Sequence, residues 1–165
     1  MATSRRPAAL THVDPAGRLR MVDVGDKPVT AREATASGFV TVSAAGLRLV
    51  RGGQVKKGNP LEAARLAGIM AAKRTSEIVP LCHPVPLTSV SVDFTARRTG
   101  YEIRASARTT AQTGVEMEAL TAVAAAALTL YDMLKAVDRT MVIGEIRLLE
   151  KKGGRSGHFR APKRR

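Results

Sequence analysis

The stretch GVEMEALTAVAAAALTLYDMLKAV, residues 114–137, decides the fold of this chain. Its middle, residues 119–130, is apolar except for Thr121 and Thr129, whereas an ordinary surface helix alternates an apolar stripe with a polar face. The pattern therefore predicts a buried helix. Both ends of this helix carry charged side chains, namely Glu116, Glu118, Asp132 and Lys135. Because an unpaired buried charge is costly, we expect these groups to be paired or to line a cleft that shifts their pKa values.

Other segments of the chain alternate apolar and polar residues with a period of two, which is typical of half-buried strands. In SVSVDFTAR, for example, Val90, Val92 and Phe94 share one face. Gly100 turns the chain from this segment into the next, and the two form a predicted hairpin. The predicted strands cover residues 39–43, 89–97, 101–110 and 141–149.

Helices are predicted between the first and the second strand. Asn59 suits the N-cap of a helix and Pro60 its first position, and the helical pattern runs on to Lys73. A shorter helix is predicted over residues 44–50. The order strand, helix, strand, strand, helix, strand is that of a ferredoxin-like α+β fold, βαββαβ, with helices on one face of a four-stranded antiparallel sheet.

Residues 21–150 are predicted to form this single α+β domain, since a chain of 165 residues suffices for one domain with a core. The flanking residues 1–20 and the basic residues 151–165 contain several Pro or Gly, so we expect two flexible segments. A two-layer fold covers only one side of each helix. The alanine-rich surface of residues 119–130 therefore predicts a homo-oligomer.

The formal net charge of +13 admits either a nucleic acid or an anionic small molecule as partner. Seven of the 27 Lys and Arg residues lie in residues 151–165, so the rest of the chain is only moderately basic. The single cysteine excludes an intramolecular disulfide, and the first residues lack the apolar core of a signal peptide. We therefore expect a cytoplasmic protein. The apolar run is shorter than the ~20 residues of a membrane span, so no membrane association is expected.

Asp132 and Lys135 are neighbours on one face of the predicted helix. They form either an exposed ion pair near a helix C-terminus or an acid and a base that share a cleft, and spacing alone does not choose. Glu118 lies on the same face, roughly 21 Å along the helix. Either a long ligand spans the helix, or its two ends contribute to sites completed by different subunits. Glu116 and Glu118 could also simply complement the positive N-terminus of the helix.

Cationic side chains gather around the predicted helix that starts at Asn59. Lys56 and Lys57 precede this helix start, where free backbone N–H groups favour a phosphate, although a solvated basic loop is the plainer interpretation. The chain contains no Walker-type motif. Lys73 adds positive charge farther along, together with Arg65 and Arg74, and a substrate with several phosphates would use such a cluster.

The segment PLCHPVP, residues 80–86, is a stiff loop, because each proline restricts itself and the residue before it. His83 is a candidate ligand-reading residue, although a lone histidine is more often structural. Cys82 suits a small buried residue better than a nucleophile, because neighbouring side chains of an extended segment point apart. No metal site is predicted, since the histidines and the cysteine show no paired ligand spacing.

Several segments resemble one family, in this order along the chain. They are LTHVD (10–14), MVDV (21–24), KKGNP (56–60), ARLAGIMAAKRT (64–75), PLCHP (80–84), TGVEMEALTA (113–122), YDMLKAV (131–137) and MVIG (141–144). These motifs resemble the cyclic pyranopterin monophosphate synthases, the molybdenum cofactor biosynthesis protein C family. The resemblance covers residues 10–158, and the joint match of PLCHP, GVEMEAL and YDM-x-KAV at these separations is highly specific.

The resemblance implies a ferredoxin-like subunit in a homohexamer, a trimer of dimers, with active sites between subunits. It implies a phosphorus–oxygen lyase that converts (8S)-3′,8-cyclo-7,8-dihydroguanosine 5′-triphosphate to cyclic pyranopterin monophosphate and releases diphosphate. The sequence demands no metal or organic cofactor, and Mg²⁺ would be compatible with a triphosphate. The expected partners are thus a nucleotide-derived small molecule and further copies of this chain, without a nucleic acid or a membrane.

Matched motif by motif, Asp132 corresponds to the family's catalytic aspartate, and Lys57 and Lys135 to its catalytic lysines. The family's substrate-binding segments match Leu81, Cys82 and His83, and also Met117 and Glu118 with Glu116 adjacent. The family motif often reads KGD where Asn59 follows Gly58 here, so one carboxylate is missing. We hypothesise that the two lysines act as acid and base, that Asp132 orients Lys135, and that Glu118 and His83 read the purine-derived end or the sugar.

A ferredoxin-like RNA-binding module is the rival function, because such sheets often bind single strands through exposed aromatic residues. This chain has three phenylalanines, two tyrosines and no aromatic RNA-binding signature, so it lacks stacking platforms for bases. A structural oligomer with a regulatory ligand is a third alternative. It would explain the apolar helix but not the lysines.

Overall fold

The computed structural model describes residues 12–162, so the predictions for residues 1–11 and 163–165 lie outside the described part. Its elements are β1 (Thr30–Thr41), α1 (Ala44–Arg51), α2 (Pro60–Ala72), α3 (Thr75–Ile78), β2 (Leu87–Arg97), β3 (Gly100–Ala111), α4 (Glu116–Leu134), β4 (Ile143–Lys152) and β5 (Phe159–Arg160). The predicted order of helices and strands is confirmed. The sequence pattern does not predict α3 and β5, which are four and two residues long.

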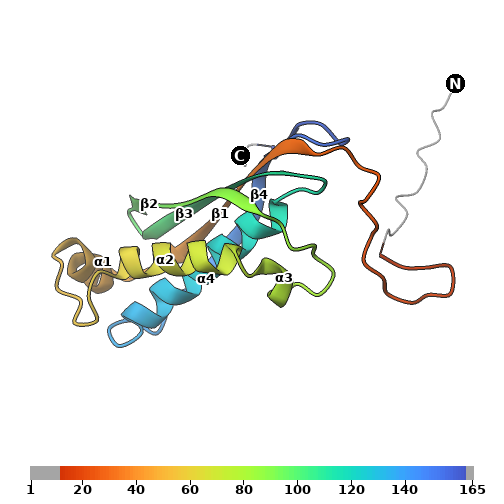
Figure 1. The fold of residues 1–165 in the computed structure, drawn as a ribbon. Helices are drawn as coiled ribbons and strands as arrows, with labels where there is room; N and C mark the ends of the chain where they lie inside the picture. Colours follow the sequence, from red (N-terminus) through yellow and green to blue (C-terminus); the bar gives the residue numbers. More distant parts are fainter. Residues whose placement is uncertain (1–11, 163–165) are drawn as a thin grey trace, which may run out of the picture.

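The sheet has the strand order β2-β3-β1-β4-β5, and all neighbouring strands pair antiparallel. Helices α2 and α4 lie side by side on one face of it (Figure 1). This arrangement confirms the ferredoxin-like α+β fold. The sheet has five strands instead of the predicted four, because the chain turns back after β4 and pairs Phe159 with Lys151.

The central strand β1 is longer than the predicted strand at residues 39–43, since it begins at Thr30. The added part contains Ala34 and Ala36, which are buried under α4 although alanine has a low strand propensity. A Cβ atom at Gly38 would lie 2.6 Å from Val123 Cγ1 of α4. Small residues are therefore present here because α4 packs so closely, and small residues give no visible strand pattern.

The predicted end of this strand at Ser43 is also wrong, because β1 ends at Thr41. Ser43 instead caps α1, since its hydroxyl oxygen accepts a hydrogen bond from the Gly46 N–H at 3.2 Å. Serine is a preferred N-cap because this bond satisfies one of the free N–H groups of the first turn.

Helix α4 is the core helix that the apolar stretch predicts. Ala119, Ala126 and Leu130 have no exposed surface, and they face the sheet and α2. By length and a mean hydropathy of 1.4, α4 is also the one described helix that would suit a membrane span, but this is weak evidence because core helices meet the same criteria. Its packing within the domain accounts for the apolar character of its buried face, whereas Leu128 on the other face is 63% exposed.

Helices α2 and α4 meet at Gly68. A Cβ atom added to Gly68 would lie 2.8 Å from the Ala122 carbonyl oxygen and 3.3 Å from Ala126 Cβ. The absence of a side chain therefore lets the two helix backbones approach closely. This contact matters for function because α2 follows the loop that carries Lys57, and α4 carries Asp132.

The sheet extends past residue 150, where the domain is predicted to end. Lys151 and Lys152 complete β4, and β5 pairs with the last residues of that strand. Glu150 Oε1 lies 2.7 Å from His158 Nε2 across this hairpin. Four residues of the basic C-terminal segment, 151, 152, 159 and 160, therefore belong to the sheet. At the other end of the described chain, Val13 and Leu19 form an isolated antiparallel bridge.

Asp138 ties the chain after α4 to the start of α1. Its buried carboxylate accepts hydrogen bonds from Ser43 N at 2.7 Å and from Thr140 N and Oγ1 at 2.9 and 2.7 Å. These bonds, with the Thr140 hydroxyl contributing most, lower the pKa of Asp138 from 3.8 to about 2. These hydrogen bonds join the start of α1, which precedes Lys57 in the chain, to the segment that follows α4, which carries Asp132.

We expect Asp138→Ala to lower the free energy of unfolding at neutral pH by about 2 kcal/mol, because the hydrogen bonds to this carboxylate are lost. The folded pKa lies below the unfolded value, so this stabilisation is present above 3.8 and disappears as pH falls through about 2. Urea unfolding of the wild type and the variant over this acid range measures the difference between them. A difference that stays constant throughout would contradict the prediction.

Candidate active site

Charged residues gather at both ends of α4, as predicted, and each end forms a cluster of its own. At the C-terminal end, Lys57, Asp132 and Lys135 are in direct contact, and we name them the lysine–aspartate cluster. At the N-terminal end, Glu116 and Glu118 line a cavity that we name the N-terminal pocket. The structure therefore divides the candidate residues between two places.

In the lysine–aspartate cluster, the Asp132 carboxylate lies between two ammonium groups. Lys57 Nζ donates to Asp132 Oδ2 and to the Asp132 carbonyl oxygen, both at 3.0 Å, and Lys135 Nζ lies 2.6 Å from Asp132 Oδ1. Hydrogen bonds from Lys135 and then Lys57 hold the pKa of Asp132 below its ordinary value, so this carboxylate is ionised at neutral pH. The three side chains are about half exposed, which leaves them accessible to a ligand.

Local structure explains why these three side chains meet. Lys135 is the C-cap residue of α4, one turn after Asp132, and the negative end of the helix dipole favours its charge. Lys57 comes from the loop between α1 and α2, where Gly58 adopts a φ of +96° that glycine tolerates best. The turn at Gly58 directs the chain from Lys57 into α2.

Asn59, where the family motif often has aspartate, has a structural role. Its side-chain oxygen accepts hydrogen bonds from the N–H groups of Leu61 and Glu62, at 3.1 and 3.3 Å, and so caps α2. Asparagine and aspartate are about equally good N-caps. The replacement therefore preserves the helix start, and with it the loop that positions Lys57.

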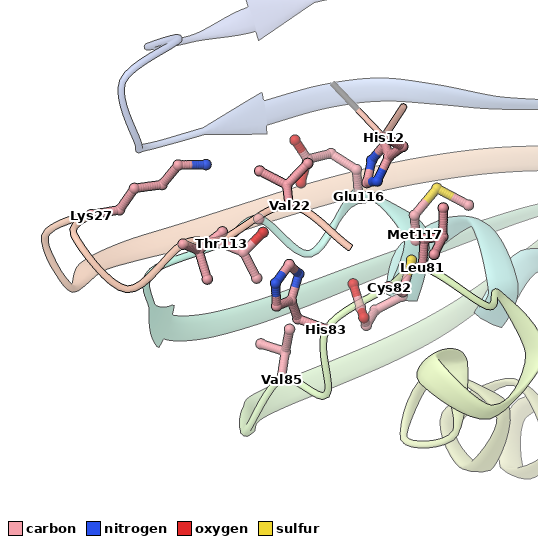
Figure 2. A pocket seen from close by; sticks show the side chains of 13 residues that line it. His12, Val22, Lys27, Leu81, Cys82, His83, Val85, Thr113, Glu116 and Met117 are labelled. Carbon is pink, nitrogen blue, oxygen red and sulfur yellow. The ribbon is translucent and has the colours of Figure 1, made fainter. Parts of the chain in front are cut away.

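The N-terminal pocket has a volume of about 410 Å³ and is built from three segments (Figure 2). The proline-rich loop after α3 contributes Leu81, Cys82, His83 and Val85. The start of α4 and the residues before it contribute Thr113, Gly114, Glu116, Met117 and Glu118. The predicted substrate-binding residues from residues 81–83 and 116–118 are thus brought together in one cavity.

Residues that precede β1 complete this pocket, although the sequence pattern did not assign them to a site. They are His12, Val22, Val24 and Lys27. Gln112 holds this segment against the end of β3, because its Nε2 donates to the Gly25 carbonyl oxygen at 2.8 Å. The available signal was that most of these residues lie within LTHVD and MVDV, two of the motifs that carry the family resemblance.

Glu118 is the most deeply buried charged residue of the pocket, with 4% of its surface exposed. Burial, and then the charge of Glu116, raises the pKa of Glu118. Within residues 12–162, only the backbone N–H of Glu118 itself donates a hydrogen bond to this carboxyl group. A buried carboxyl group that lacks other donors is suited to a ligand that presents N–H groups.

Cys82 lines the same pocket and is half-buried, whereas the sequence favours a small buried residue over a nucleophile. Burial, and then the charge of Glu118, raises the pKa of the Cys82 thiol. A protonated thiol is a poor nucleophile, so the raised pKa does not favour nucleophilic chemistry at Cys82. Cys82 is partly exposed because the proline-rich loop places its side chain at the wall of the cavity.

Lys73 lies in neither cluster, because it is the exposed C-cap residue of α2. Arg65 is also engaged elsewhere. Its guanidinium group donates to the Val92 carbonyl oxygen and lies over the Phe94 ring. The structure therefore does not gather these residues with Lys57 into one phosphate site. Among residues 12–162, no group of three or more His, Cys, Asp or Glu side chains could hold a metal ion.

Glu118→Gln should stabilise the isolated protein at neutral pH. Since the folded pKa of Glu118 is raised above its ordinary 4.5, the ionised carboxylate weakens the folded state at pH values above 4.5 and has no such effect below it. Glutamine removes the charge at nearly the same volume. Urea unfolding should therefore show a higher free energy of unfolding for Glu118→Gln than for the wild type, and this gain should grow as pH rises. Glu77→Gln, at an exposed carboxylate, is the matched control, and an equal gain in both variants would refute the prediction.

Comparisons with known proteins agree with the resemblance. A model of the MoaC family matches residues 21–154. A protein of Parvibaculum lavamentivorans is 58% identical over 154 residues, which cover 92% of this chain and 96% of that protein. One of Thermomicrobium roseum is 59% identical over 155 residues, 93% of each chain, and one of Chloroflexus aggregans is 60% identical over 152 residues, 91% of this chain and 92% of the relative. All three relatives are named cyclic pyranopterin monophosphate synthase.

Proposed function

Because the chain belongs to the MoaC family, we propose that it converts (8S)-3′,8-cyclo-7,8-dihydroguanosine 5′-triphosphate to cyclic pyranopterin monophosphate and releases diphosphate. The names of its relatives, at 58–59% identity over nearly the whole chain, support the role of a cyclic pyranopterin monophosphate synthase in molybdenum cofactor biosynthesis. The chain is accordingly an enzyme of the lyase type.

The observation that carries this proposal is the lysine–aspartate cluster. Opening a guanine-derived ring and closing a cyclic phosphate both move protons around a polyanion. Lysines serve both needs, because an ammonium group donates a proton and also stabilises negative charge on phosphate. In the proposed mechanism Lys57 and Lys135 are the acid and the base, and Asp132 holds their nitrogen atoms next to each other through its two carboxylate oxygens.

The N-terminal pocket supplies the second half of the proposal. We assign the purine-derived ring or the sugar to this pocket, with Glu118 and His83 as the residues that read it. The buried Glu118 carboxyl group supports this assignment, since an ionised carboxylate accepts hydrogen bonds and a guanine-derived ring edge offers N–H donors. The triphosphate then extends toward the cationic groups.

Glu118 and Asp132 are separated by fourteen residues of α4, roughly 21 Å along its axis, which favours a site completed by two subunits over one ligand that spans the helix. The proposed active site is therefore shared between subunits of a homohexamer, a trimer of dimers. We further propose that the enzyme works in the cytoplasm without an organic cofactor or a resident metal ion, and that any Mg²⁺ arrives with the triphosphate. No nucleic acid or membrane partner is proposed.

The test is to supply the cyclised GTP derivative to the purified full chain and to measure diphosphate release together with the product mass. We expect stoichiometric diphosphate and cyclic pyranopterin monophosphate, with GTP itself as the matched control that releases none. Equal release from GTP would indicate a general triphosphate hydrolase and refute the proposal. Binding of single-stranded RNA in place of turnover would favour the RNA-binding alternative.

A further inference from the structure

Lys57 belongs to a part of the chain that makes little contact with the other elements. This part is α1 with the loop that follows it, residues 44–58, and we name it the α1 unit. Figure 1 shows α1 at one end of the domain, beyond α2. Helix α1 buries Leu47, but it makes few contacts with the other helices and strands. Packing between elements therefore does little to fix the position of Lys57.

A cavity lies between the α1 unit and the end of α4. It has a volume of about 330 Å³, and its walls are mostly apolar. The α1 unit contributes Leu49 and Val55 to these walls, and the end of α4 with the residues after it contributes Met133 and Val137. Because a well-packed interior contains few voids larger than a water molecule, the packing of the loop against α4 is incomplete here.

Polar contacts connect the start and the loop of this unit to the end of α4 at two places in the described chain 12–162. One is the exposed ion pair between Lys57 and Asp132. The other is Asp138, whose backbone N–H donates to the Leu134 carbonyl oxygen in the last turn of α4, at 3.0 Å. The carboxylate of Asp138 accepts a hydrogen bond from the N–H of Ser43, the N-cap residue of α1, at 2.7 Å. Asp138 therefore joins the two helix ends directly.

Asp138 makes the stronger of these two connections. It is 6% exposed, whereas the Asp132 side chain is 53% exposed. Exposed ion pairs contribute little because water screens them, and hydrogen bonds to a buried charge are stronger. Hydrogen bonds from Thr140 and then Ser43 lower the pKa of Asp138 to about 2, so the accepting, ionised form is present at neutral pH.

We infer that Asp138 is a positioning residue for the reaction, because it fixes the start of α1 to the end of α4 and so sets where Lys57 lies relative to Asp132. The inference rests on the proposed function, since it takes Lys57 to act on the substrate. Asp138 itself belongs neither to the lysine–aspartate cluster nor to the N-terminal pocket. It acts through Lys57.

The first test is Asp138→Asn, which keeps the shape of the side chain but replaces one accepting oxygen with an NH₂ group that only donates. We expect kcat for diphosphate release to fall by about 10-fold to 100-fold, since a misplacement of about 1 Å costs on the order of 10²-fold. Thr140→Val is the milder variant, because it removes only the hydroxyl that donates to this carboxylate. It should show the same effect in smaller degree.

A double-mutant cycle distinguishes positioning of Lys57 from a general loss of structure. In a Lys57→Ala background the group that Asp138 positions is gone, so Asp138→Asn should leave the residual kcat within about twofold. Its effect on the urea midpoint should be the same in both backgrounds. An equal fold-loss of kcat with and without Lys57 would overturn the inference, as would an unchanged kcat of Asp138→Asn in the wild-type background.

Lysine acylation tests the position of Lys57 without any substrate. The Lys57 amine must leave its hydrogen bonds to Asp132 before it attacks acetic anhydride, so these bonds slow its acylation. Lys56, the exposed neighbour, is the internal reference, and mass spectrometry gives the ratio of the two rates. This Lys57:Lys56 ratio should rise at least about twofold in Asp138→Asn and in the positive control Asp132→Asn. A rise in the control alone would overturn the inference.

Ser106→Ala is the matched control for lost stability. It removes a hydrogen bond within the sheet, between the Ser106 and Thr35 hydroxyl groups at 2.9 Å, and leaves the α1 unit intact. It should lower the urea midpoint and leave both kcat and the acylation ratio unchanged. A loss of kcat as large as that of Asp138→Asn would overturn the inference.

The outcomes for the wild type separate this inference from the proposed function. An active wild type with an equally active Asp138→Asn variant would overturn the inference and leave the proposed function standing. An inactive wild type would refute the proposed function. The acylation ratio would then still decide whether Asp138 positions Lys57.

Discussion

Lys57→Ala should lower kcat for diphosphate release by about 10²–10⁴-fold, the range that one positioned acid or base contributes. The ammonium group of Lys57 holds the Asp132 carboxylate at 3.0 Å, so its removal takes away a proton-transfer group and one of the two cations that fix the aspartate. The structural cost should be small, because this ion pair is about half exposed. Steady-state kinetics and a urea unfolding curve of the same preparation separate the two effects.

Lys56→Ala is the matched control for this variant, because Lys56 is an exposed lysine at the preceding position and lies outside the lysine–aspartate cluster. The variant removes the same charge from the same loop but no residue of the cluster. We therefore expect its kcat to stay within about twofold of the wild type. If Lys57 only bound phosphate, Lys57→Ala would raise KM and leave kcat unchanged. That result, or wild-type turnover, would refute a catalytic role for Lys57.

Leu130→Ala should lower the free energy of unfolding by about 2–5 kcal/mol, the usual cost of truncating a buried leucine. Leu130 has no exposed surface and belongs to the core between α4 and the sheet. Since small domains have total stabilities of about 5–15 kcal/mol, this single change removes a large share. Urea unfolding measures this loss in the free energy of unfolding. The protein concentration is held constant, because an oligomer gains stability by mass action.

Leu66→Ala is the control for the core variant, because it removes the same atoms from a leucine that is 62% exposed on α2. Its effect should stay below about 1 kcal/mol, since surface substitutions rarely exceed that value. Equal losses in the two variants would contradict the assignment of Leu130 to the core. A loss confined to Leu66→Ala would point to an interface on α2.

The elements that the sequence predicts well are those whose side chains follow a regular period. The hairpin of β2 and β3 and the core helix α4 have such patterns, and their predicted bounds are close to the observed ones. β1 is predicted too short because it is built from small residues that α4 covers closely. β5 has only two residues, which is too short for any pattern.

The candidate site likewise contains contacts that the sequence predicts and contacts that depend on tertiary packing. Asp132 and Lys135 pair because residues three apart on a helix are neighbours, so their contact follows from the sequence alone. His12 and Lys27 could not be placed from spacing, because their position in the N-terminal pocket depends on how the segment before β1 lies against the end of β3. The family motifs indicated that these segments matter, but not where they lie.

The sequence by itself determined the helix α4, the order of the elements and the family, because local periodicity and motif order do not depend on tertiary packing. Tertiary structure alone decided that Lys57 reaches Asp132, 75 residues away, and that Glu118 is buried. The physical reason is that such contacts depend on which faces pack, here on the close approach of α2 to α4 at Gly68. Backbone geometry sets local spacing, whereas side-chain packing sets distant contacts.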